Sequence, residues 1–245
     1  MTYCVGIAVD DGLVFLSDSR TNAGVDQIST FIKTTLFEQQ NDRVLVLMSS
    51  GNLAISQAVV SILNENIANQ AEANLMNVTS MFHAAKLVGD AIRQIHKRDA
   101  EALKESSLEF SVSFILGGQI KGEAPRLFNI YAAGNFIEAT AETPYFQIGE
   151  SKYGKPILDR VITRSIGLAK ATKCALISMD STIRSNLSVG LPLDLVCIKR
   201  DALRVLSHVL IDSDHKYFSM IRTGWSESLR SAFHQLPDPD WLGKP

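Results

Sequence analysis

The sequence lacks the features of a disulfide-stabilised or nucleic-acid-binding protein. Its three cysteines, Cys4, Cys174 and Cys197, are too few and too scattered for a disulfide framework or a zinc site, which fits a reducing cytoplasm. Lys plus Arg is 24 against 26 for Asp plus Glu, giving a formal net charge of -2. Without a basic excess to neutralise phosphates, nucleic-acid binding is excluded as the main function.

Long hydrophobic runs are also missing. No segment approaches the ~18 uncharged apolar residues of a membrane-spanning helix. Residues 1–16 are apolar-rich, but they lack a basic start and are interrupted by Asp10-Asp11-Gly12, so we expect neither a signal peptide nor a membrane anchor. No phosphate-binding or dinucleotide glycine motif is present. The polar cluster at 212–215 predicts a solvated turn rather than a metal site, because adjacent strand residues point to opposite faces. We therefore expect no cofactor and no metal.

What is present is ordinary globular composition. The 245 residues are 46% apolar and 20% charged, enough for one large core or two small ones. No internal repeat, low-complexity tract or Pro/Gly-rich linker divides the chain. We predict one domain over residues 1–245, in which residues 237–245 form a C-terminal arm.

Hydrophobic periodicity predicts runs of strands separated by pairs of helices. Strands are expected at 3–9, 13–17, 30–38, 43–50, 109–116, 126–132, 136–139, 145–148, 193–199 and 203–209. Helices are expected at 54–73, 78–97, 151–163 and 165–184. Asp10-Asp11-Gly12 is a hairpin turn signal, and Gly117-Gly118 is expected to close a strand. This order predicts an antiparallel α+β protein, with sheet packed on sheet and helices outside.

Thr2 follows the initiator methionine directly. Removal of Met1 would expose a residue that carries both a hydroxyl nucleophile and an α-amine, whose pKa of about 8 suits a general base. A retained Met1 would leave Thr2 without that amine. Taken alone, a threonine at position two is common and carries no functional meaning.

Nearby residues change this assessment. The hairpin brings Asp18 back beside the N-terminus, and an aspartate can orient the ammonium of Lys33, expected in the third strand. A lysine charge lowers the pKa of a neighbouring hydroxyl. Gly51 ends the fourth strand where a helix begins and could present a backbone N–H to an oxyanion. Singly, Asp18, Lys33, Arg20 and Gly51 have plain structural explanations: a turn acid, surface charges and a strand-to-helix turn.

Together these segments resemble the proteasome-type N-terminal nucleophile hydrolases, and within them the bacterial ancestral-beta-subunit (Anbu) family. The matching segments are Thr2-Tyr3-Cys4-Val5-Gly6, Leu16-Ser17-Asp18-Ser19-Arg20-Thr21-Asn22-Ala23-Gly24, Lys33, Ser49-Ser50-Gly51-Asn52, Ile148-Gly149-Glu150-Ser151 and Ser185-Asn186-Leu187-Ser188-Val189-Gly190. The similarity covers nearly the whole chain, and as a set the motifs are specific.

The resemblance implies a four-layer αββα sandwich. It implies Thr2 as nucleophile, Asp18 and Lys33 as its supporting pair, Gly51 as oxyanion donor and Arg20 as a supporting residue. Two positions depart from the family pattern. Ser185 occupies the place of an aspartate three residues before Ser188, and the Gly-Ser-Gly-Ser turn has become Gly149-Glu150-Ser151-Lys152. Ser151 is the expected counterpart of the serine near the threonine amine.

The resulting hypothesis is a threonine peptidase subunit that cleaves peptide bonds through an acyl-enzyme. It would act inside a homo-oligomer, a ring or a helix, that restricts access to the site. The weakly charged helices expected at 54–73 and 78–97 suit subunit contacts. Two alternatives remain: a non-catalytic ring or scaffold subunit of the same fold, and an amidase for a small amide. The sequence identifies no partner unfoldase.

Overall fold

The first two strands form the centre of one sheet. The computed structural model describes residues 2–22 and 28–242. β1 (Tyr3–Val9) and β2 (Gly12–Asp18) pair antiparallel and are buried along their whole length. The predicted hairpin turn at 10–12 is confirmed, with Gly12 at a φ of +149° that favours glycine. Burial on both faces explains why these strands are continuous apolar runs rather than alternating ones.

Two five-stranded antiparallel sheets face each other. The first has the order β10-β1-β2-β11-β12, with β10 (Tyr145–Gly149), β11 (Leu193–Lys199) and β12 (Val205–Ile211). The second has the order β5-β6-β7-β8-β9, formed by β5 (Thr34–Gln39), β6 (Arg43–Gly51), β7 (Val112–Ile120), β8 (Arg126–Ile130) and β9 (Phe136–Glu138). A small ribbon of β3 (Arg20–Asn22) and β4 (Ile28–Thr30) links the two sheets in the chain.

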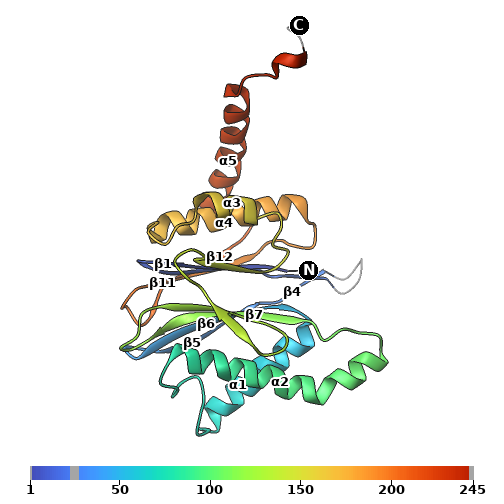
Figure 1. Cartoon of the computed structure of the whole chain (residues 1–245), viewed down its shortest axis with the longest axis vertical. Helices are drawn as coiled ribbons and strands as arrows, with labels where there is room; N and C mark the ends of the chain where they lie inside the picture. Colours follow the sequence, from blue (N-terminus) through green and yellow to red (C-terminus); the bar gives the residue numbers. More distant parts are fainter. Residues whose placement is uncertain (1, 23–27, 243–245) are drawn as a thin grey trace.

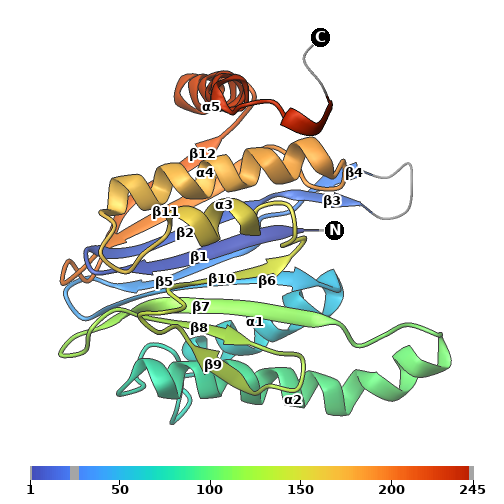
Figure 2. The same ribbon diagram turned by 45° about the horizontal axis from the view of Figure 1, so that its top comes forward.

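Helices cover both outer faces, so the predicted four-layer αββα sandwich is confirmed (Figures 1 and 2). α1 (Leu53–Ala68) and α2 (Met81–Glu105) cover the second sheet, while α3 (Lys155–Val161) and α4 (Leu168–Ser185) cover the first. Three apolar cores fill the three spaces: one under α1 and α2, one under α3 and α4, and one between the sheets. Three buried layers of this kind supply the main stabilisation of the fold.

Several predicted element boundaries are wrong. The strand expected at 30–38 is two elements, β4 and β5, and Lys33 lies between them rather than in a strand. α1 ends at Ala68 instead of 73, and α2 continues to Glu105 instead of 97. α3 begins only at Lys155, with Pro156 in its first turn, because proline is tolerated there and not further along.

Gly117 and Gly118 do not close a strand, contrary to expectation. β7 runs through both to Ile120. A Cβ at Gly117 would lie 2.7 Å from Cζ of Phe15 in the facing sheet, and one at Gly118 would overlap the backbone of Val44. The two glycines are therefore places of close approach within a strand, not strand ends.

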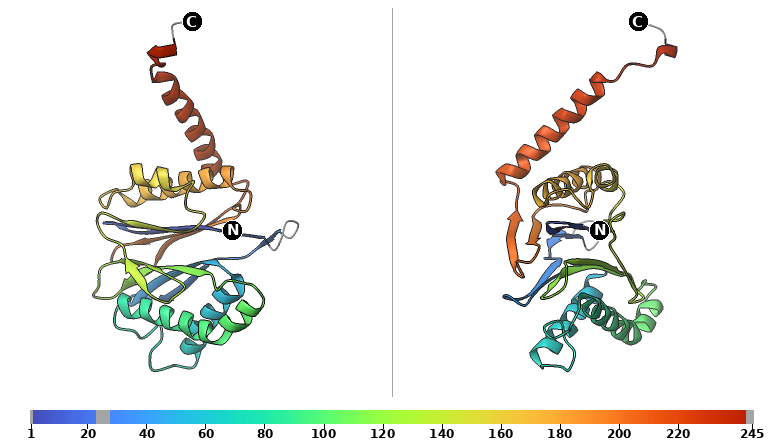
Figure 3. Two further views of the ribbon diagram at one scale, coloured as in Figure 1. Left: turned by 45° about the vertical axis from the view of Figure 1, so that its right-hand side comes forward. Right: turned by 60° about the vertical axis from the view of Figure 1, so that its left-hand side comes forward.

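No element is predicted from the sequence for residues 216–235, yet the structure has a 20-residue helix there, α5 (Lys216–Gln235). Among the described residues, the buried side chains of α5 are Phe218 and Ile221 in its first turns, and its second half projects away from the sandwich (Figures 1 and 3). Of the expected C-terminal arm, residues 237–242 continue outward and include a 3-10 turn, Asp240–Leu242. Residues 243–245 lie outside the described part of the chain.

Candidate active site

Thr2 lies at the open end of the first sheet, immediately before β1. Its neighbour Tyr3 pairs with Gly149 of β10, and the backbone N–H of Glu150 donates to the carbonyl oxygen of Thr2 at 2.7 Å. Gly149 has a φ of +82°, and a Cβ there would overlap that same oxygen. Glycine at this position therefore lets the N-terminal segment lie directly against β10. Met1 lies outside the described residues.

Asp18, the last residue of β2, is brought beside the N-terminus as the hairpin predicts. Its Oδ1 accepts from the backbone N–H of Tyr3 at 3.0 Å and from Nζ of Lys33 at 2.6 Å. Lys33 also donates to the backbone oxygen of Arg20 at 2.7 Å. The side chains of Lys33 and Asp18 are 6% and 0% exposed, so this is a buried, oriented ion pair. Burial raises the pKa of Asp18, while Lys33 and the N–H groups of Tyr3 and Gly190 oppose that rise.

Arg20 holds a neighbouring loop rather than reaching the cleft. Its Nη1 donates to the backbone oxygen of Leu187 at 2.7 Å, and its guanidinium lies where a Cβ of Gly190 would be. The N–H of Gly190 in turn donates to Oδ2 of Asp18 at 3.3 Å. Arg20 therefore fixes the loop that completes the hydrogen bonding of Asp18.

Gly51 ends β6 at the start of α1. It has a φ of +103°, and a Cβ would overlap the backbone oxygen of Ser111. The next residue, Asn52, caps α1: its Oδ1 accepts from the N–H of Ala54 at 2.9 Å. This tight strand-to-helix turn places Gly51 and the start of α1 in the lining of the cleft, and a helix N-terminus favours negative charge.

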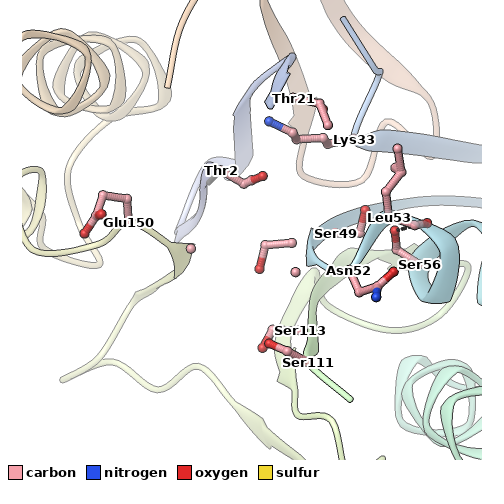
Figure 4. A pocket seen from close by; sticks show the side chains of 13 residues that line it. Thr2, Thr21, Lys33, Ser49, Asn52, Leu53, Ser56, Ser111, Ser113 and Glu150 are labelled. Atoms are coloured by element: carbon pink, nitrogen blue, oxygen red, sulfur yellow. Dashed lines mark hydrogen bonds between the residues drawn. The ribbon is translucent and has the colours of Figure 1, made fainter. Parts of the chain in front are cut away.

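These elements surround a cleft of about 740 Å³. Figure 4 shows Thr2 facing a wall of Ser49, Asn52 and Ser56, with Lys33 at one end and Glu150 on the opposite side. The lining residues are Thr2, Thr21, Lys33, Ser49, Ser50, Gly51, Asn52, Leu53, Ser56, Ser111, Ser113, Gly149 and Glu150. The structure thus brings Thr2, Lys33 and Gly51 together around one space, with Asp18 buried behind Lys33.

Comparison with known proteins places this arrangement in a family. The family model described as proteasome subunit matches residues 2–197. The chain belongs to the proteasome family. It is 54% identical to a solved structure of Anbu (ancestral beta-subunit) from Yersinia bercovieri, covering 97% of this chain and 99% of that one at a TM-score of 0.92. The helical assembly of the Anbu complex from Pseudomonas aeruginosa is 48% identical, with coverage of 99% and 100% and a TM-score of 0.94.

A more distant relative agrees. Proteasome subunit beta 2 of Nitrosopumilus maritimus is 25% identical over 210 residues, 84% of this chain and 90% of that protein. The expected resemblance to the Anbu branch of the proteasome family is therefore confirmed.

Three serines are expected to support the site of this proteasome-family chain, with Ser151 as the counterpart of the serine near the threonine amine. Within the described residues, Ser151, Ser185 and Ser188 are not part of the cleft lining. Ser151 lies in the turn before α3, and its carbonyl accepts from the N–H of Lys155 at 3.0 Å. Ser185 ends α4, and the N–H of Ser188 donates to Oδ1 of Asn186 at 2.9 Å. Their support of the site stays a prediction.

Glu150 was not expected among the site residues, yet it lines the cleft. Its Oε2 accepts from Nδ2 of Asn186 at 2.7 Å, its Oε1 lies 3.5 Å from Nζ of Lys152, and its side chain is 11% exposed. The sequence feature that could have identified Glu150 is its position directly after Gly149, which pairs with Tyr3 at the start of β1. Ser111 and Ser113 had no sequence signal of their own, because they reach the cleft only through the pairing of β7 with β6.

Other candidates have structural roles. Cys4, Cys174 and Cys197 are free and buried, and burial raises the pKa of each thiol. The 212–215 segment is a turn whose His215 caps α5. Over residues 2–22 and 28–242, no group of His, Cys, Asp or Glu could hold a metal ion, and no helix is long and apolar enough to cross a membrane.

Proposed function

We propose that this chain is a threonine-type N-terminal nucleophile hydrolase that cleaves peptide bonds. The observation that carries the proposal is the Lys33 ammonium, held between Asp18 and the Arg20 carbonyl and bordering the same cleft as Thr2. A fixed positive charge beside a hydroxyl favours its deprotonated form and so raises its nucleophilicity.

In the proposed reaction, Oγ of Thr2 attacks the substrate carbonyl carbon and its proton passes to the α-amine, free after removal of Met1. The carbonyl oxygen becomes negative and is stabilised by the N–H of Gly51. The amine leaving group takes the proton as the C–N bond breaks, leaving an ester on Thr2. Water then attacks that ester, which releases the carboxylic acid and restores the hydroxyl.

Thr2→Ala should lower turnover of a peptide with a fluorescent amine leaving group by about 10³-fold or more, because it removes the nucleophile. Thr2→Ser, which keeps both hydroxyl and amine, is the matched control and should retain measurable activity. Intact mass spectrometry of the same samples should show that Met1 is absent. Wild-type activity in Thr2→Ala would refute the proposal.

A non-catalytic subunit of the same fold is the second candidate. The observation that favours it is Ser185, at the end of α4, where the family pattern has an aspartate. A peptide β-lactone distinguishes the two, because a reactive Thr2 opens the lactone ring and gains the full mass of the probe as an ester. A small-amide hydrolase would use the same chemistry, and a panel of peptides and amino-acid amides separates it from a peptidase.

We also propose a homo-oligomer well above a dimer, acting in the cytoplasm. The Anbu complex of Pseudomonas aeruginosa is described as a helical assembly. Here α5 and the residues after it expose Met220, Leu229, Phe233, Leu236 and Trp241, and the described part of the chain leaves Trp241 82% exposed. Apolar side chains gathered on a projecting helix are typical of a subunit contact.

Sedimentation at micromolar concentration should give a mass many times 26.9 kDa. Phe233→Ser should lower that mass, because it removes an exposed phenyl ring near the end of α5 without disturbing a core. Leu108→Ser, an exposed leucine far from α5, is the control and should sediment like wild type. A monomeric wild-type protein would contradict the proposed assembly.

A further inference from the structure

The side chains around the cleft are mostly neutral and polar. Besides Thr2, hydroxyl groups come from Thr21, Ser49, Ser50, Ser56, Ser111 and Ser113. Asn52 adds an amide, and within the described lining Leu53 is the one large apolar side chain. A hollow beside α3 and α4 differs sharply, since Ile157, Val161, Ile166, Ile177 and Trp225 line it. Hydroxyls both donate and accept hydrogen bonds, so the cleft can bind either kind of polar group.

The two charged residues in the described lining of the cleft are already paired within the protein. Lys33 is committed to Asp18, and Glu150 is held by Lys152 and Asn186. Figure 4 shows the Glu150 side chain on the side away from Ser49 and Ser56. A charged substrate side chain entering between those serines would lose hydration without meeting an opposite charge that is available to it.

One hydroxyl in the lining has no hydrogen-bond partner among the described residues. Within the part of the chain that the structure describes, Oγ1 of Thr21 is buried and makes no hydrogen bond. Buried hydroxyls are nearly always hydrogen-bonded, and an exception calls for an explanation. A polar substrate atom lying in the cleft would provide the missing partner.

We infer that the cleft selects substrates whose attacked residue carries an uncharged amide side chain, glutamine or asparagine. This inference rests on the proposed function for the position of the attacked carbonyl, at Thr2. The hydroxyl of Ser56 already donates to the carbonyl oxygen of Leu53 at 3.0 Å, so its oxygen is left to accept from the amide NH2, while the hydroxyl of Ser49 donates to the amide oxygen. A leucine of similar size would displace water from those hydroxyls and return no hydrogen bond, which is how polar sites reject apolar analogues.

The first test uses four peptides that differ only at the attacked residue: glutamine, leucine, glutamate and lysine. With a common fluorescent leaving group, kcat/KM should be highest for glutamine, by about tenfold or more, the effect expected of one or two net hydrogen bonds. Equal or faster cleavage after leucine, glutamate or lysine would overturn the inference.

The second test changes the wall. Ser49→Ala combined with Ser56→Ala should lower kcat/KM for the glutamine peptide several-fold and raise it for the leucine peptide, which reverses or abolishes the preference. Ser165→Ala, an exposed serine outside the cleft, is the matched control and should leave the ratio unchanged. An unchanged glutamine-to-leucine ratio in the double variant would also overturn the inference.

Binding separates this inference from the proposed chemistry. Calorimetric titration of the Thr2→Ala protein with peptides ending in glutamine amide or leucine amide measures selection without turnover. A lower Kd for the glutamine peptide, with no hydrolysis by the wild-type protein, would leave the selectivity standing and refute the hydrolase. Equal Kd values would refute the selectivity whatever the activity.

Discussion

Two buried aspartates are used in opposite ways by this fold. Asp18 accepts from a lysine that is itself buried and that borders the cleft. Asp180 of α4 accepts from Nε of Arg184 at 2.9 Å and from Nε of Arg222 of α5 at 2.8 Å, and both arginines are partly exposed to solvent. The first pair fixes a charge beside Thr2, whereas the second fastens the base of α5 to the sandwich. A buried carboxylate can thus either position a charge for catalysis or hold two elements of the fold together.

The raised pKa of Asp18 adds to this contrast. Burial disfavours the ionised form by more than Lys33 and the N–H donors recover. Ionised Asp18 therefore lowers the stability of the folded protein, and the proposed activity depends on it. Such conflicts between stability and function are common at active sites.

The substitution Asp18→Asn should have the largest effect on activity. We expect kcat/KM to fall by about 10²-fold or more, because Lys33 loses the charge that orients it. Stability should be unchanged or higher, since the amide resembles the protonated acid that the buried site favours. Kinetics and urea unfolding of the same samples measure both. A large loss of stability would show that the pair is structural, and wild-type activity would remove Asp18 from the site.

Asp180→Asn should show the reverse pattern. We expect it to lose about 1–3 kcal/mol of stability, because two hydrogen bonds to charged groups are weakened. Activity per folded Thr2 should stay within about twofold of wild type, because Asp180 lies in α4 and is not part of the cleft lining. The oligomer of the variant should dissociate at a higher protein concentration than the wild-type oligomer, because α5 is held less firmly. Urea unfolding, active-site titration and sedimentation provide the three readouts, and a collapse of activity per site would break the distinction between the two aspartates.

The smallest effect concerns pH. The ordinary pKa of aspartate is about 3.9, and burial moves that of Asp18 upward. Between these two values the folded state binds more protons than the unfolded state, so ionisation of Asp18 lowers stability as pH rises through the window. Activity should rise through the same window, since it needs the ionised form. Asp18→Asn should lose this acid limb, and a limb that survives in the variant belongs to another group.

Local sequence signals predicted the centre of the fold well. The Asp10-Asp11-Gly12 turn fixes the β1–β2 hairpin, and the hairpin alone places Asp18 beside Tyr3. β11 was predicted to the residue at 193–199, because a buried apolar run is unmistakable when turns bound it. These features depend on neighbours in the chain, which is why the sequence specifies them.

Features that depend on distant segments could not be predicted in this way. From the sequence, the glycine pair at 117–118 predicts the end of a strand, because nothing in the local pattern shows that Phe15 and Val44 lie against it. The place of Ser111 and Thr21 in the cleft lining follows from how distant segments are brought together, not from local pattern. α5 has few buried positions, so its apolar residues lack the strong stripe that marks a packed helix.

The position of α5 also allows association to be followed by tryptophan fluorescence, without an added label. The chain has two tryptophans, Trp225 within α5 and Trp241 beyond its end, and none borders the cleft over the described residues. Trp241 is 82% exposed in the isolated chain. Tryptophan fluorescence of this protein therefore reports on α5 and the segment that follows it. A blue shift of the emission on raising protein concentration would follow association directly, and occupation of the cleft would leave the spectrum unchanged.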